Sequence, residues 1–158
     1  MKGQEYAPTV ENIVRTCSQA LSRSEECPLL LENAAGKKAV GSRFEHLADL
    51  IDCLGGDKRV GICIDACHSH AAGYDVRSIE AVTESFDELD RIVGLDRVGC
   101  LHVNDSRDEF GSHRDRHANL GEGLIGEEGL AAFLSDPRLG DVPALLEVPG
   151  DGKSGPAL

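Results

Sequence analysis

Four residues with acid–base or metal-binding side chains recur along the chain at intervals of 33, 37 and 45 residues. They are Glu32, Asp65, His102 and Glu147, and each lies at or near the end of a short apolar run. Three carboxylates and one imidazole are oxygen and nitrogen donors that suit a divalent ion such as zinc or manganese. Without a cation, carboxylates in one cleft would raise each other's pKa, because like charges repel. If the fold brings these residues together, they predict a metal site.

A second set of candidate ligands lies close to the first in sequence and in a later polar segment. His68 comes three residues after Asp65, at the point where we expect a strand to turn into a loop. Asp115 and His117 flank Arg116 in the polar segment, and with His68 they would supply a second metal site. The alternative for Asp115 and His117 is a solvated loop, since such short motifs often occur by chance.

Apolar runs alternate with helical patterns along the chain, which predicts an α/β fold. Buried strands of a parallel sheet are indicated at residues 29–31, 60–64, 98–103 and 144–148. Apolar residues at three- and four-residue spacing predict helices at residues 10–21, 44–54, 79–93 and 130–134. Ser42 and Glu45 form a capping box for the second helix. Because the carboxyl ends of parallel strands share one face, the four strand-end residues would converge there.

The segment 105–122 has no helical or strand periodicity. A loop of this length inside an α/β unit is usually functional or disordered. Since it carries Asp115 and His117, we expect it to contribute to the site.

The composition limits the kinds of partner and location. The 158 residues carry 28 acidic and 16 basic side chains, a net charge of −12, which argues against a broad basic face for nucleic acid. No apolar run reaches about 18 residues and no apolar signal region follows Met1, so we expect neither a membrane span nor export. The six cysteines form no CxxC pair, and we expect reduced core thiols and a cytoplasmic location.

Five parts of the chain resemble the signature segments of the endonuclease IV family, in that family's order. They are LENAAG at 31–36, DACH at 65–68 with AGYD at 72–75, LHVNDS at 101–106, DRH at 115–117 with GEGLIG at 121–126, and LEVPG at 146–150. The segments are long, and the Asp-Arg-His element is not shared with generic barrels. The resemblance is therefore specific.

This resemblance implies a TIM barrel of the xylose isomerase-like superfamily that cleaves double-stranded DNA 5′ to abasic sites with three zinc ions. It assigns four residues to the strand-end metals: Glu32, Asp65, His102 and Glu147. Glu32 would bridge two of these metals, and Glu147 would also orient or deprotonate the attacking water. It assigns three others to the third zinc: His68, Asp115 and His117. Zinc would supply the positive charge that an acidic chain needs at a DNA substrate.

The chain departs from the family pattern in length. A TIM barrel takes roughly 250 residues, whereas residues 1–158 hold four strand runs. We therefore expect a single partial domain, the C-terminal half of such a barrel, without two histidine ligands and the DNA-bending loops of the earlier strands. Alone, it would be weakly active or inactive. It would associate with itself or with an N-terminal half, because its edge strands lack barrel neighbours.

Two other functions are open at this point. Sugar isomerases and epimerases of the same superfamily also place Glu, Asp, His and Glu at strand ends, so those residues do not separate the activities. The second set, His68 with Asp115 and His117, favours the nuclease, since a one-metal epimerase does not need it. A half-barrel that binds metal without catalysis is the third interpretation.

Overall fold

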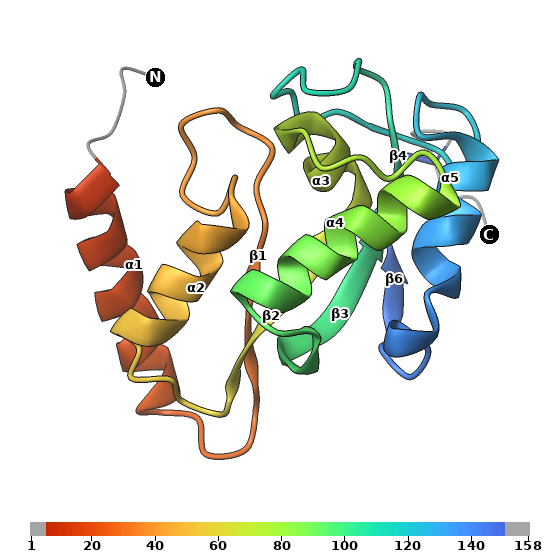
Figure 1. Ribbon diagram of the computed structural model, residues 1–158. Helices are drawn as coiled ribbons and strands as arrows, with labels where there is room; N and C mark the ends of the chain where they lie inside the picture. The colour runs from red at the N-terminus through yellow and green to blue at the C-terminus, as the bar shows by residue number, and fades with distance from the viewer. Residues whose placement is uncertain (1–5, 151–158) are drawn as a thin grey trace.

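The computed structural model describes residues 6–150, and its centre is a parallel sheet with the strand order β1-β2-β3-β6 (Figure 1). The strands are β1 (Leu29–Glu32), β2 (Val60–Asp65), β3 (Val98–Val103) and β6 (Ala144–Leu146). The four predicted strands and the α/β class are confirmed. After β6 the backbone N–H of Glu147 donates to Val103 O at 3.2 Å, so Glu147 stays beside the end of β3.

Helices alternate with these strands, as the periodicity predicts. They are α1 (Tyr6–Leu21), α2 (Phe44–Cys53), α4 (Ile79–Ile92) and α5 (Gly126–Ser135), with short 3-10 turns at η1 (Leu95–Arg97) and η2 (Pro137–Leu139). The predicted bounds differ mainly at two places. α1 begins at Tyr6, before Pro8, which lies in its first turn, where proline is tolerated. α5 begins four residues before the first apolar residue of its pattern.

The two faces of the sheet have different surroundings. Alternate strand residues, such as Ile62 and Leu101, join Phe86 of α4 and Phe133 of α5 in one hydrophobic core. Leu145 lies outside that core and is 55% exposed. One sheet face is thus covered by helices, while the opposite face remains partly open.

The predicted capping box of α2 is wrong. Arg43 is the N-cap and makes no side-chain cap bond, while Ser42 Oγ donates to Ala39 O at 2.9 Å in the preceding turn. The N–H of Phe44 instead donates to the Tyr74 hydroxyl at 3.0 Å. This partner lies 30 residues away, so a local sequence pattern could not identify it.

The segment 105–122 has a defined structure, although it lacks periodicity. β4 (Asp105–Ser106) pairs with β5 (His117–Ala118) in a small antiparallel sheet. Arg116 makes a bidentate bond to Asp108, with Nε to Oδ2 at 2.7 Å and Nη2 to Oδ1 at 2.5 Å. The short ladder and this ion pair together fix where Asp115 and His117 lie.

The cysteines are all free thiols, but the expectation that they are core residues is correct for only four of the six, including the half-buried Cys17 that packs against the core. Cys63, Cys67 and Cys100 are buried, whereas Cys27 and Cys53 are exposed. Cys27 comes before β1 and Cys53 ends α2, and neither position faces the core.

Candidate metal centre

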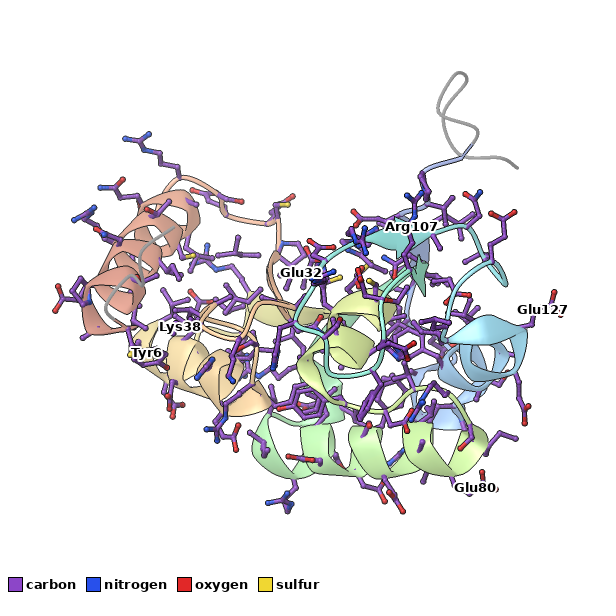
Figure 2. The ribbon with its side chains drawn as sticks, turned by 90° about the horizontal axis from the view of Figure 1, so that it is seen from above. Tyr6, Glu32, Lys38, Glu80, Arg107 and Glu127 are labelled. Atoms are coloured by element: carbon purple, nitrogen blue, oxygen red, sulfur yellow. The ribbon has the colours of Figure 1, made fainter. Side chains whose placement is uncertain are left out.

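The four strand-end residues meet at the carboxyl edge of the sheet. Each offers a ligand atom, and these atoms lie within 4.8 Å of one another. His102 Nδ1 is central, at 3.2 Å from Glu32 Oε1, 3.5 Å from Glu147 Oε2 and 4.0 Å from Asp65 Oδ2. Figure 2 shows Glu32 near the middle of the molecule in the view from above. The parallel register therefore produces the convergence that the sequence spacing predicts.

Asp65 is the buried anchor of this group, with no exposed surface. Its Oδ1 accepts from the backbone N–H of His68 at 2.7 Å, and its Oδ2 accepts from Asn104 Nδ2 at 2.5 Å. Burial raises the pKa of Asp65, because it disfavours the charged carboxylate, and these hydrogen bonds oppose the rise. Asp65 is also the N-cap of a helix, α3 (Ala66–Ala72).

The helix α3 corrects the expectation that a loop follows β2. Because it starts directly at Asp65, it places His68 in its first turn, close to the strand end. His68 Nδ1 lies 3.2 Å from Glu32 Oε1, and Glu32 Oε1 is also 3.2 Å from His102 Nδ1. Glu32 therefore lies between the two imidazoles.

The second candidate set also assembles in space. Asp115 lies between two imidazoles, with Oδ2 at 3.2 Å from His68 Nε2 and Oδ1 at 3.1 Å from His117 Nε2. His117 Nε2 is 4.0 Å from Asp65 Oδ2, which places this set directly beside the strand-end set. A solvated loop does not describe His117, which is 20% exposed and lies beside Asp65, whereas Asp115 is 58% exposed while its carboxylate contacts both imidazoles.

Both imidazoles of the second set are oriented through their Nδ1 atoms. His68 Nδ1 lies 2.9 Å from Asn33 O, and His117 Nδ1 lies 2.7 Å from Glu147 O. A carbonyl oxygen only accepts, so each Nδ1 carries the proton and each Nε2 presents a lone pair. This is the arrangement that orients histidine ligands in metal sites.

Each Nε2 atom can therefore only accept a hydrogen bond. The Asp115 carboxylate that it faces can also only accept, so the two groups cannot bond each other directly. His68 Nε2 is buried and has no hydrogen-bond partner among residues 6–150. A buried polar atom without a partner is unfavourable, and a cation between nitrogen and carboxylate removes the conflict. The donor types and this unpartnered nitrogen fit a divalent ion such as zinc.

Without a metal, a proton is the remaining cation for this position. Burial disfavours the charged form of His68, but its hydrogen bond to Glu32 and the charges of Asp65 and Asp115 together raise its pKa to about 9. The same bond to His68 lowers the pKa of Glu32, against the effect of burial. The carboxylates thus hold a positive charge on His68 when no metal is bound.

Two asparagines that support the site were not identified from the sequence. Asn33 Oδ1 accepts from the backbone N–H of Asp65 at 2.7 Å, and Asn104 Nδ2 donates to Asp65 Oδ2. Both are fully or nearly fully buried. Their position in the sequence could have identified them, since each follows a strand-end ligand by one or two residues.

Among the described helices, none is long and apolar enough to cross a membrane.

Comparison with known families identifies the fold. Residues 2–158 match the family model described as xylose isomerase-like TIM barrel. The chain belongs to this family. The resemblance to endonuclease IV is confirmed by the relatives that it matches.

The relatives of this xylose isomerase-like chain carry consistent names. A probable endonuclease 4 of Chloroflexus aurantiacus is 50% identical over 122 residues, which cover 77% of this chain and 43% of the relative. A probable endonuclease 4 of Alkaliphilus oremlandii is 42% identical over 144 residues, covering 90% and 50%. The crystal structure of endonuclease IV from Thermus thermophilus aligns with a TM-score of 0.78 and 43% identity, over 89% of this chain and 51% of that chain. The chain spans about half the length of these relatives.

The raised pKa of His68 predicts a pH dependence of stability for the metal-free chain. A folded pKa of about 9 lies above the ordinary value of 6.5, so the stabilisation is fully present below pH 6.5 and is lost as the pH rises toward 9. In urea titrations of chelator-treated protein, we expect the free energy of unfolding to fall across this window by on the order of 2 kcal/mol. His68→Gln should flatten the curve. Equal pH profiles for both proteins would contradict the assignment.

Proposed function

We propose that this chain forms the zinc-binding half of a DNA repair endonuclease that hydrolyses the phosphodiester 5′ to abasic sites. The observation that carries the proposal is the second donor set, in which His68 Nε2 and His117 Nε2 both face Asp115. A second nitrogen-rich set beside the strand-end set suits a multi-zinc phosphodiesterase. The names of the relatives agree with this class of reaction.

The donors of the site are open to a substrate on one side. The side chains of Glu32, Glu147 and Asp115 are 37%, 44% and 58% exposed, whereas Asp65 is fully buried. The exposed carboxylates would therefore line the surface that a DNA phosphate approaches. Bound zinc would supply the positive charge that attracts the phosphate oxygens and polarises them for attack.

The chain's own residues have separate roles in this proposal. Glu32 would hold metal at the strand ends, as the resemblance implies, and its Oε1 lies 3.2 Å from His102 Nδ1. Glu147 would orient the attacking water and accept its proton, since its carboxylate is exposed beside His102. Asp65 would be a fixed metal ligand, because buried hydrogen bonds hold its carboxylate in place.

The sugar isomerase and the non-catalytic half-barrel are the alternatives. The strand-end set alone suits a sugar isomerase equally well, and the second donor set favours the nuclease. A non-catalytic role would follow if this half binds metal but lacks the ligands that the complete family carries on earlier strands. For the same reason we propose that the chain alone is a weak enzyme.

Its six free thiols support a reducing, cytoplasmic location.

We expect the isolated chain to incise an abasic-site duplex only feebly in the presence of zinc. Losing one catalytic electrostatic contact commonly costs about 10² to 10³ in rate, and an incomplete metal set should cost at least as much. Incision should rise when a four-strand N-terminal half is supplied in trans, and Glu147→Gln should abolish it. Glu128→Gln, on the exposed side of α5, is the matched control and should have no effect.

Two results would count against this account. Robust incision by the unsupplemented chain would contradict the predicted weakness. Absence of incision from the supplemented pair, with zinc bound, would contradict the nuclease proposal itself.

We also expect the chain to self-associate through its open sheet edges. β1 and β6 end the sheet, and within residues 6–150 no strand pairs with their outer sides. Leu145 and Leu146 of β6 are 55% and 46% exposed. Unpaired edges with apolar side chains favour strand addition.

Sedimentation equilibrium at tens of micromolar, on the order of ordinary assay concentrations, should show concentration-dependent association. Leu145→Lys should weaken it, whereas Leu134→Lys, on the exposed side of α5, should not. A monomer at all concentrations would refute this expectation.

A further inference from the structure

Two buried thiols lie directly beneath the strand-end donors. Cys63 on β2 and Cys100 on β3 are paired residues of neighbouring strands and are 3% and 6% exposed. Their Sγ atoms and a ring nitrogen of His102 lie within 4.8 Å of one another. Neither thiol has a part in the proposed hydrolysis.

The two thiols form a layer on the sheet face that also carries the strand-end donors. Cys63 precedes Asp65 by two residues and Cys100 precedes His102 by two, so each thiol shares a sheet face with the donor above it. Below them, Leu30 Cδ2 lies 2.9 Å and 2.7 Å from the positions that a Cβ would take at Gly61 and Gly99. Leu30 therefore closes the underside of the layer, while the carboxylates lie on its upper side.

We infer that Cys63, Cys100 and His102 form a further site for a thiophilic divalent cation such as cadmium, which shares His102 with the strand-end set. Two sulfurs and one imidazole nitrogen favour soft and borderline ions, whereas the carboxylates above favour harder ones. Binding would form two metal–sulfur bonds and one metal–nitrogen bond and would release the two thiol protons to the buffer, with no change of oxidation state. A water molecule would complete a four-coordinate site.

The test is a cadmium titration of the reduced, chelator-treated chain, followed by the ultraviolet charge-transfer absorption of the cadmium–thiolate bond. The background protein carries Cys27→Ser and Cys53→Ser, which remove the two exposed thiols. We expect saturation at about one cadmium per chain, as the ligand count predicts. Cys63→Ala and Cys100→Ala should each reduce the absorption and raise the Kd at least about tenfold.

Cys17→Ala, in α1 and distant in sequence from the site, is the matched control and should leave the titration unchanged. Titrations of Cys63→Ala and Cys100→Ala that equal the background would overturn the site. So would loss of the absorption in Cys67→Ala alone, because Cys67 lies near Asp115 and His117 instead.

A second measurement avoids the risk that a core variant fails to fold. Alkylation of the background protein, with peptide mapping, should show that cadmium slows modification of Cys63 and Cys100 but not of Cys17. Equal rates with and without cadmium would overturn the inference. Neither readout depends on DNA cleavage, so a negative result here leaves the nuclease proposal standing, and the reverse also holds.

Discussion

Groups that repel one another are held within contact distance at the carboxyl edge of the sheet. Glu32, Asp65 and Glu147 surround one imidazole, and the Nε2 atoms of His68 and His117 face Asp115. Carboxylates and lone pairs in such an arrangement are unfavourable unless a cation lies among them. This need for positive charge is the main physical argument for a metal site at this edge.

The fold holds these groups together through Asp65, the least mobile of them. Asp65 is buried, caps α3, and is held by the buried amides of Asn33 and Asn104. The opposing wall is fixed by the small β4–β5 sheet and the pair between Arg116 and Asp108. A preorganised donor set of this kind does not have to move when an ion binds, which lowers the cost of binding. The exposed carboxylates are then the adaptable part of the site.

The strand-end set could be predicted from the sequence because the order of strands and helices alone decides where these residues lie. Short apolar runs separated by helical patterns imply a parallel sheet, and a parallel sheet collects its carboxyl ends at one edge. Details that depend on long-range contacts could not be predicted. The Tyr74 hydroxyl replaces the expected capping box at Phe44 from 30 residues away, and the roles of Asn33 and Asn104 appear only when three strands are side by side. The helix α3 was also missed, since Ala66–Ala72 is too short for a periodic pattern and depends on Asp65 as its cap.

The central claim is that this edge of the sheet is built to hold a divalent cation. Calorimetric titration of zinc into the chelator-treated chain tests it most directly, with His117→Ala as the probe of the second donor set and Glu128→Gln as the control. The account predicts at least about one zinc per chain, from the ligand count, with the zinc bound by the second donor set lost or weakened in His117→Ala and binding unchanged in Glu128→Gln. A chain that binds no zinc, or one that binds it equally well in all three proteins, would contradict the account.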